Sequence, residues 1–408
     1  MKIGIVGGSL AGCSAAALLI NAGHEVTVFE RSAKTLTGRG GGIGTTRQVI
    51  EEIKGQGLID PAFSYLTATR QPFIGKHPAH EPYGRTAWSL PFEIQVFHWN
   101  ELWQQLRKNV PDNCYHSGVE VVDATPLAKG NVKLSTSNGN KHEFDMVLFA
   151  DGYKSLGRKI LFPKQQLTYR GYVLWRGLLD ESEMNPGELH DQLPRMSYQQ
   201  APGHHVVYFI PNKDGSQEIG ERIFNWAAYI AVTEKELDAL MTNPSGRVRH
   251  GTLPPGELTA SNEQKLKDFL AQHIPDYYAE MVNKTTDSYI QVIYTLELDR
   301  YYANNMLLIG DAGMVVQPFT GSGIFKGYSN IKDLITCLNK NDILENALAE
   351  WSEQQVATGK RLLAYGEQLE QAFIWEPKNF SNENAEVISD WYKQAVTPPR
   401  DFNFERKE

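Results

Sequence analysis

Short apolar runs and a segment of small residues alternate at the start of the chain. Residues 2–7 (KIGIVG) are almost continuously apolar, as expected for a parallel strand that is covered on both faces. Residues 10–22 (LAGCSAAALLINA) predict a helix that ends near Gly23, and residues 25–30 (EVTVFE) predict a second strand. The order strand, helix, strand predicts a βαβ unit at the N-terminus.

The middle of the chain follows a different pattern, rich in aromatic and β-branched residues. Residues 169–179, 204–211 and 222–230 have this composition, and turn-forming clusters separate them. They predict strands of an antiparallel sheet. Residues 233–243 and 261–273 predict helices.

The last part of the chain returns to buried strands and then to helices. Residues 288–298 and 306–310 predict strands, and a glycine-rich turn then leads to a helix from about residue 324. Apolar residues at mostly helical spacing in 344–373 predict one or two long helices. Residues 376–408 are mostly polar, and we expect a loose tail there.

Composition and charge exclude several classes of protein. A chain of 408 residues is too long for one ordinary core, which predicts two domains or one domain with an insertion. Its net charge of -8 and the lack of a long basic run argue against nucleic-acid binding.

The cysteines and the apolar stretches indicate the cellular compartment in which we expect the protein. Cys13, Cys114 and Cys337 are far apart in the chain, which argues against a disulfide framework or a zinc site, and we expect no metal. A reduced, cytoplasmic setting fits this pattern best. The sequence holds no uncharged apolar stretch of the length that a membrane-spanning helix needs, so we expect no membrane segment.

The first chemical motif is GGSLAG, between the first predicted strand and the first predicted helix. Glycines in such a turn let the backbone approach a pyrophosphate, which rests on the helix N-terminus. Ser9 stands where a second glycine is usual, and Glu30 ends the second strand, where an acidic residue can meet ribose hydroxyls. The motif predicts FAD or NAD rather than NADP; the alternative is a tight turn without a ligand. The candidate residues are Gly7, Ser9, Leu10, Ala11, Gly12, Glu30 and Arg31.

The second motif, LLIGDAG, covers residues 307–313 and favours a flavin. A buried strand ends in Gly310 and Asp311, so the carboxylate emerges at the carboxyl end of a parallel strand, where ligands bind. An aspartate at this point can accept hydrogen bonds from a ribityl chain, and the following glycines open a helix whose N-terminus stabilises negative charge. The alternative is a simple turn before a helix. The further candidates here are Pro318, Gly321, Gly323 and Ile324.

The third motif is ADGYKS, residues 150–155, which follows the apolar strand 146–149. Asp151 stands directly after this strand and Arg158 lies a few residues further on. The alternative is a turn that Asp151 caps. A strand that ends in Asp-Gly, with Ser155 and Arg158 close by, is rare by chance.

These three motifs, in their order along the chain, resemble those of the single-component (group A) FAD-dependent aromatic hydroxylases. The resemblance covers residues 1 to about 375. Within that family the chain is similar to the 2,6-dihydroxypyridine 3-hydroxylases in Ser9, in residues 171–177 (GYVLWRG), in residues 224–226 (FNW) and in Lys326. The resemblance implies that Asp311 binds the ribityl chain and that residues 318–324 line the isoalloxazine ring. It also implies that Asp151 and Arg158 serve both FAD and nicotinamide binding. The chain also departs from the family, because Trp99 stands where many relatives have an arginine that contacts FAD.

The resemblance also implies a fold and a reaction. The expected fold is α/β: a Rossmann-type FAD-binding domain with an inserted, mostly antiparallel substrate domain and C-terminal helices. We expect the FAD-binding domain in residues 1–165 and 291–375, the substrate domain in 166–290 and the tail in 376–408. NAD(P)H would bind transiently and reduce FAD. Oxygen would then form a flavin C4a-hydroperoxide that hydroxylates a small aromatic or N-heteroaromatic substrate.

Candidates for substrate contact lie on the predicted antiparallel sheet. Alternation places Tyr172 and Arg176 on one face of a strand and Trp175 on the other. A cation or base near the substrate hydroxyl would favour its more nucleophilic, ionised form. The alternative is that these side chains only pack the sheet. The candidate catalytic residues are Arg176, Tyr172, Tyr208 and Pro318.

Two other classes of function stay open at this point. One is a flavin oxidoreductase that does not hydroxylate aromatics, such as a reductase or an antibiotic-inactivating monooxygenase. The other is an inactive dinucleotide-binding module. The sequence does not decide the oligomeric state or the choice between NADH and NADPH.

Overall fold

The N-terminal βαβ unit forms the centre of a mostly parallel sheet in the computed structural model, which describes residues 1–37, 40–128, 130–185, 189 and 191–398. Within these residues the sheet has six strands, in the order β17 (Tyr302–Ala303), β18 (Met306–Leu308), β10 (Met146–Phe149), β1 (Lys2–Val6), β2 (Glu25–Glu30) and β6 (Tyr115–Ser117). All neighbours are parallel except β17 and β18. The carboxyl ends of β1, β10 and β18 therefore meet at one edge, and all three sequence motifs follow these strands.

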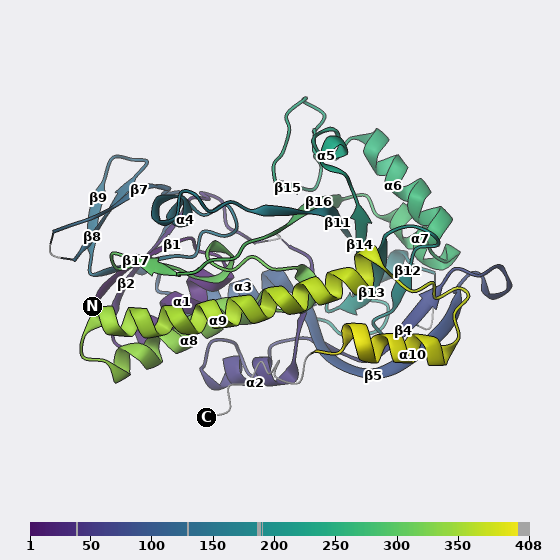
Figure 1. The fold of residues 1–408 in the computed structure, drawn as a ribbon, viewed down its shortest axis with the longest axis horizontal. Helices are drawn as coiled ribbons and strands as arrows, with labels where there is room; N and C mark the ends of the chain where they lie inside the picture. Colours follow the sequence, from purple (N-terminus) through teal and green to yellow (C-terminus); the bar gives the residue numbers. More distant parts are fainter. Residues whose placement is uncertain (38–39, 129, 186–188, 190, 399–408) are drawn as a thin grey trace.

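Helices cover this sheet. The helices of the described residues are α1 (Leu10–Asn21), α2 (Arg47–Gly55), α3 (Trp99–Lys108), α4 (Leu156–Leu161), α5 (Glu234–Leu240), α6 (Ala260–His273), α7 (Asp276–Lys284), α8 (Phe325–Lys340), α9 (Leu344–Glu370) and α10 (Ala385–Trp391). The helix α1 packs against α3 and α8, and the long helix α9 packs along α8 (Figure 1).

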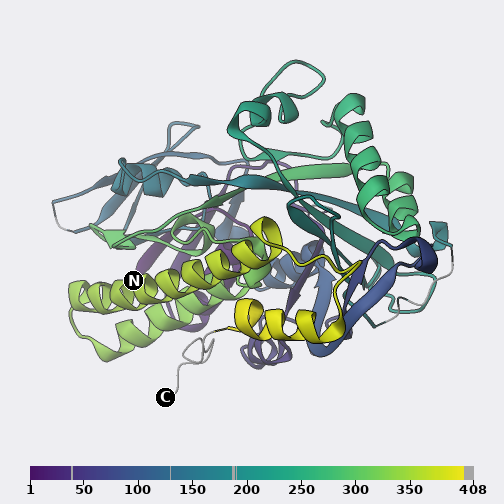
Figure 2. The same cartoon turned by 45° about the vertical axis from the view of Figure 1, so that its right-hand side comes forward.

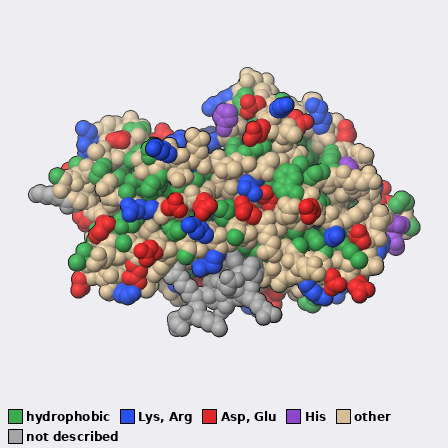
Figure 3. Space-filling model, viewed as in Figure 1, with side chains coloured by type: hydrophobic (Ala, Val, Ile, Leu, Met, Phe, Trp, Pro, Cys, Tyr) green, Lys and Arg blue, Asp and Glu red, His purple; other side chains and the backbone are tan. Residues whose placement is uncertain are grey.

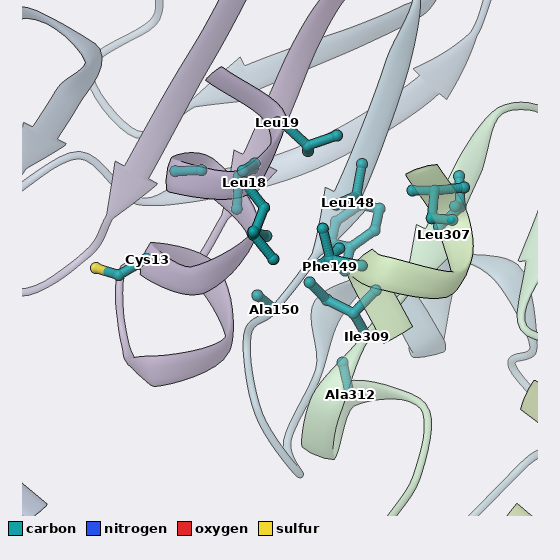
Figure 4. Close-up of a cluster of buried hydrophobic side chains, with 14 of the residues drawn as sticks. Cys13, Leu18, Leu19, Leu148, Phe149, Ala150, Leu307, Ile309 and Ala312 are labelled. Carbon is teal, nitrogen blue, oxygen red and sulfur yellow. The ribbon is translucent and has the colours of Figure 1, made fainter. Parts of the chain in front are cut away.

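The core of this part lies where α1, β10 and the segment after β18 meet (Figure 4). Alanine and leucine dominate the buried side of α1, so the helix lies close to the strands. The labelled members of this core are Cys13, Leu18, Leu19, Leu148, Phe149, Ala150, Leu307, Ile309 and Ala312.

A second, mostly antiparallel sheet fills the other half of the molecule. In the described part of the chain it has nine strands, in the order β15 (Thr252–Leu253), β16 (Ser288–Thr295), β11 (Thr168–Asp180), β14 (Ile223–Ala231), β13 (Gly203–Ile210), β12 (Arg195–Ser197), β4 (Leu66–Gly75), β5 (Arg85–His98) and β3 (Gly42–Thr45). The predicted strands 169–179, 204–211 and 222–230 are present as β11, β13 and β14, so the expected antiparallel sheet is confirmed.

Side chains alternate across this sheet as the sequence predicted. Trp175 belongs to the hydrophobic cluster that includes Leu266 and Met281 of α6 and α7. Tyr172 and Leu174 belong to a different cluster on the opposite face. One face of the sheet is therefore covered by α6 and α7, and the other face points toward the motif-bearing loops.

The N-terminal third of the chain contributes to both sheets. The strands β3, β4 and β5 join the nine-stranded sheet, although they lie within residues 1–165, the expected first part of the FAD-binding domain. A smaller sheet, β7 (Val121–Pro126), β8 (Val132–Thr136) and β9 (Lys141–Phe144), lies between them and β10 in the chain. The expected boundary after residue 165 thus does not coincide with the division between the sheets.

The expected loose tail is wrong for the residues that the structure describes. The helix α10 and the following turn pack against β5 (Figure 2). The apolar residues of this segment are widely spaced among polar ones, so the sequence reads as polar, yet they fill one cluster with Phe73. The buried members from this segment are Phe380, Ile388, Trp391 and Val396. Residues 399–408 of the expected tail lie outside the described residues.

Charge is mixed on the face that α9 covers, where Asp and Glu side chains are interspersed with Lys and Arg (Figure 3). Among the described helices, none combines the length and the apolar character that crossing a bilayer requires.

Candidate active site

The turn between β1 and α1 is too tight for a side chain at two positions. A Cβ on Gly7, whose φ is +105°, would lie 2.5 Å from the backbone oxygen of Ala150. A Cβ on Gly12 would lie 1.9 Å from the backbone oxygen of Gly7. Because both positions are glycine, the N-terminus of α1 reaches the edge of the sheet, where its amides can meet an anion.

The start of α1 faces a large cavity. Ser9 precedes the helix in an extended conformation, and its side chain caps no amide of the described residues. Gly7, Ser9, Leu10 and Ala11 line the cavity. Gly12 is buried behind them, so it contributes close packing rather than a surface for a ligand.

Glu30 lies at the end of β2 on the wall of the same cavity, and its side chain is fixed. One carboxylate oxygen accepts a hydrogen bond of 2.9 Å from the amide of Gly8, and the other accepts one of 2.8 Å from the amide of Ser32. Each oxygen retains a lone pair for a further donor. Arg31 lines the cavity next to it.

The second sequence motif, with Gly310 and Asp311, also lines the large cavity. The φ of Gly310 is +56°, and its amide donates to the side-chain oxygen of Asn330 over 2.8 Å. Asp311 forms an ion pair of 2.5 Å with Lys326; the Asp311 side chain is 50% exposed, whereas that of Lys326 is 4% exposed. Lys326 also donates to the carbonyl of Met314 over 2.7 Å. The cation is thereby buried behind a carboxylate that stays accessible from the cavity.

Asp151 combines one satisfied and one free carboxylate oxygen. Its Oδ2 accepts hydrogen bonds of 2.6 Å and 3.3 Å from the amides of Leu156 and Gly157, at the start of α4. Its Oδ1 is buried and has no partner among the described residues, although Asp151 lines the cavity. Burial raises the pKa of this carboxyl group. An acceptor in this state is suited to a ligand hydroxyl or amide.

Arg158, in contrast, does not line the cavity. It donates 2.9 Å to the carbonyl of Ala312 and also to the carbonyl of Tyr153, so it joins the loops after β10 and β18. The sequence placed Arg158 at the cofactor; the structure places it behind the wall, where it holds the two loops together.

The large cavity has a volume of about 1350 Å³ and extends from Gly7 and Glu30 to Asp311 and Gly323. Small-molecule sites usually have about 300–1,000 Å³, so this space accommodates a larger, extended ligand. The hydrogen-bonding groups of its wall fit a flavin dinucleotide. Helix amides can donate to a pyrophosphate, carboxylates can accept from hydroxyls, and Asp151 offers an unpartnered buried acceptor.

A smaller cavity of about 470 Å³ adjoins the large one. It lies between the nine-stranded sheet and the loop of residues 315–324, which includes Pro318, Gly321 and Ile324. The two cavities share part of their walls. The shared residues are Leu10, Ile43, Trp99, Tyr153, Arg176, Thr252, Gln291, Asp311 and Gly323.

Of the predicted substrate residues, the structure brings Arg176, Tyr208 and Pro318 to the smaller cavity. Arg176 donates to the carbonyl of Gly42 and, over 3.5 Å, to the side-chain oxygen of Asn225. Burial raises the pKa of Tyr208 to about 12, although Arg176 opposes this shift, so the phenol stays protonated at neutral pH.

Tyr172 does not line either cavity. Its hydroxyl donates 3.3 Å to the carboxylate of Glu370, and its ring is stacked with Phe319 at a centroid distance of 6.4 Å. Tyr172 therefore supports the loop of residues 315–324 from behind.

Several residues that line the cavities were not predicted from the sequence. Gly41, Gly42 and Ile43 line the cavities, and the glycine run of residues 40–44 was a signal that could have revealed them. Arg195 and His204 also line the smaller cavity. No motif marks Arg195, because it lies on a strand of only three residues.

Comparisons with known proteins agree with this geometry. Residues 5–54 match the model of an NAD(P)-binding Rossmann-like domain, and residues 169–295 match that of an FAD binding domain-like family. The chain is 28% identical to 2,6-dihydroxypyridine 3-monooxygenase of Paenarthrobacter nicotinovorans, over 89% of both proteins. It is 26% identical to 3-amino-4-hydroxybenzoate 2-monooxygenase of Streptomyces cremeus, over 83% of this chain and 79% of that enzyme.

Solved structures show the same fold. The 2,6-dihydroxypyridine-3-hydroxylase from Arthrobacter nicotinovorans superposes with a TM-score of 0.81 at 24% identity, covering 93% of this chain and 95% of that one. Klebsiella pneumoniae HpxO, solved with FAD and uric acid, gives a TM-score of 0.72 at 16% identity, covering 97% and 92%. These similarities confirm the resemblance to the aromatic hydroxylases, and the chain is an FAD-dependent monooxygenase.

Proposed function

We propose that the protein uses NAD(P)H and oxygen to hydroxylate a small, electron-rich aromatic or N-heteroaromatic compound. The observation that carries the proposal is the junction of the two cavities, whose shared wall includes Arg176, Asp311 and Gly323. A dinucleotide in the large cavity would present its reactive end at this junction, directly beside a space for a small substrate.

In this arrangement the chain holds FAD along the large cavity. The start of α1, with Gly7 and Ser9, meets the pyrophosphate, and Glu30 meets the ribose. Asp311 accepts from the ribityl hydroxyls. The segment from Gly321 to Ile324 follows the isoalloxazine ring, close to the start of α8. The free oxygen of Asp151 accepts a further donor from the cofactor.

The substrate lies in the smaller cavity. When bound and reduced by NAD(P)H, FAD supplies the activation of oxygen. Arg176 favours the ionised form of a substrate hydroxyl, and the loop that contains Pro318 forms part of the cavity wall. Tyr208 keeps its proton and can donate a hydrogen bond to a substrate oxygen.

The size of the smaller cavity favours this function over the alternatives. About 470 Å³ suits a one-ring or two-ring compound better than a large antibiotic. The named substrates of the two relatives, a dihydroxypyridine and an aminohydroxybenzoate, are small and electron-rich. A reductase would not need a separate space for an aromatic ring beside the cofactor.

The test is substrate-stimulated oxidation of NADH and NADPH by the purified flavoprotein. We expect at least one hydroxylated benzene or pyridine to accelerate NAD(P)H consumption, and Arg176→Gln to reduce this acceleration at least about tenfold by removing the cation. If no compound of a broad panel accelerates it, while artificial acceptors are reduced rapidly, the protein is a reductase.

A further inference from the structure

Arg195 is a buried cation that forms no ion pair with any residue that the structure describes. It lies on β12, lines the smaller cavity and is 8% exposed. Its Nε and Nη1 are buried and donate to no acceptor of the described residues. The nearest compensation is the ring of Phe373, whose centroid lies 3.9 Å from the guanidinium carbon. Burial lowers the pKa of Arg195 to about 10, so it still carries its charge at neutral pH.

Other buried arginines of the described chain are paired. Arg222 forms an ion pair of 2.6 Å with Glu181. Arg158 donates to backbone carbonyls, including that of Ala312. Burying a charge without such partners is costly, so an arginine in this state indicates a partner that arrives with a ligand.

Strand pairing places Arg195 and Arg176 in one row of residues across four neighbouring strands. Arg195 pairs with Val206, Val206 pairs with Ala227, and Ala227 pairs with Arg176. Residues paired in this way point to the same face of a sheet, and the three steps separate the two Cα atoms by about 14 Å. Val206 and Ala227, both small, form the floor of the smaller cavity between the two cations.

The smaller cavity is positively charged as a whole. Its charged wall residues, within the described chain, are Arg176, Arg195, Lys326 and Asp311. Lys326 and Asp311 neutralise one another, which leaves the two arginines. Only Arg176 of these two also lines the large cavity, so Arg195 marks the end that is remote from the cofactor.

We propose that Arg195 binds a carboxylate of the substrate and that the substrate is an aromatic acid. The inference rests on the proposed function and narrows its substrate class. A flat ring lies over Val206 and Ala227, with its hydroxyl toward Arg176 and its carboxylate toward Arg195. A guanidinium matches a carboxylate through two parallel hydrogen bonds from one edge, either Nε with Nη2 or Nη1 with Nη2. The unpartnered Nε and Nη1 of Arg195 leave one donor open on each of these edges.

The experiment compares ligands that differ only in the acidic group. Binding of 4-hydroxybenzoate and 4-hydroxybenzamide to the oxidised holoenzyme is measured by perturbation of the flavin spectrum, without NAD(P)H. The pair of 6-hydroxypyridine-3-carboxylate and its carboxamide is measured in the same way. We expect the carboxylate of at least one pair to bind about tenfold to a hundredfold more tightly than the carboxamide.

Two variants of Arg195 and one control variant test whether Arg195 causes the preference for the carboxylate. Arg195→Gln should abolish the preference for the carboxylate, and Arg195→Lys should keep part of it, because the charge stays but the bidentate geometry is lost. Arg70→Gln is the matched control, since Arg70 is an exposed cation on the neighbouring strand β4 that lines neither cavity. It should bind all four ligands like the wild type.

The inference is overturned if the wild type shows no preference in either pair, or if Arg195→Gln weakens acid and amide equally. Because binding is measured without turnover, it is independent of the proposed reaction. A preference that depends on Arg195 supports the inference even if no hydroxylated product forms. Hydroxylation of neutral compounds with no preference for acids overturns the inference and leaves the proposed function intact.

Discussion

Glu370 accepts a hydrogen bond of 2.8 Å from the side-chain amide of Gln317, which joins the last turn of α9 to the loop before Pro318. The same carboxylate pairs with Arg170 over 2.8 Å and is almost completely buried. Glu370 thus fixes the loop that closes the smaller cavity, although it does not line the cavity itself.

Glu370→Gln should therefore loosen this loop. We expect the free energy of unfolding to fall by about 1–3 kcal/mol, because the buried network loses its negative charge and one of its two acceptor oxygens. FAD affinity should fall with it. Denaturant titration and flavin binding measure the two effects. The control is Glu367→Gln, whose half-exposed carboxylate lies 3.4 Å from Arg170 and should contribute only about 0–1 kcal/mol. Equal effects of both variants would contradict this role of Glu370.

Gly12→Val should expel the flavin. The new Cβ would lie 1.9 Å from the backbone oxygen of Gly7, so α1 must move off the sheet. We expect at least about 1–3 kcal/mol of lost stability and no retained FAD after purification. The control is Gly55→Ala, at an exposed position where a Cβ meets no other atom within 4 Å, and it should keep both. A yellow, normally stable Gly12→Val protein would refute the βαβ site.

Asp311→Asn should weaken FAD binding about tenfold to a hundredfold, by removing a charged acceptor. It also leaves the buried ammonium of Lys326 without the negative charge that now pairs with it, although the carbonyl of Met314 still accepts its hydrogen bond. The double variant Asp311→Asn, Lys326→Met separates the two effects, because it removes both charges. We expect it to recover the stability of the apoprotein but not the affinity for FAD, measured by titration. Recovery of FAD affinity would show that Asp311 only neutralises Lys326.

His205 should make the protein sensitive to mild acid. Its ring is 6.0 Å from that of Trp226, and both ring nitrogens are buried without partners among the described residues. Burial lowers its pKa to about 3, against about 6.5 in the unfolded chain. The unfolded state therefore binds more protons below pH 6.5, and the free energy of unfolding falls as the pH drops toward 3.

His205→Leu should remove this contribution. The stability of the variant relative to the wild type should rise by about 2 kcal/mol between pH 7.5 and pH 5.0. Denaturant titration at both pH values measures the difference. A difference that does not change with pH would mean that His205 is solvated or already charged in the native state.

The cofactor motifs were predictable because local sequence determines them. A βα turn with Gly7 and Gly12, a buried strand followed by Asp311, and the alternation around Trp175 all depend on neighbours in the chain. The predicted faces of β11 agree with the structure for this reason.

The smaller cavity was predictable only in part, because distant segments build it. Arg195 and Arg176 lie on the same face of the sheet because β12, β13, β14 and β11 are neighbours, and no local pattern encodes this strand order. Tyr172 has the expected face but is covered by Phe319 and Glu370, which lie far away in the chain. The packing of the C-terminal segment was missed since its four core side chains, Phe380, Ile388, Trp391 and Val396, are separated by stretches that contain polar residues.

Transfer of an oxygen atom to an aromatic ring is the central claim, and mass spectrometry of the product formed under labelled molecular oxygen tests it most directly. The wild type should convert a stimulating hydroxylated aromatic compound into a product that carries one labelled oxygen atom, with NAD(P)H consumed in equal amount. Release of labelled hydrogen peroxide alone, with every aromatic compound recovered unchanged, would contradict the claim.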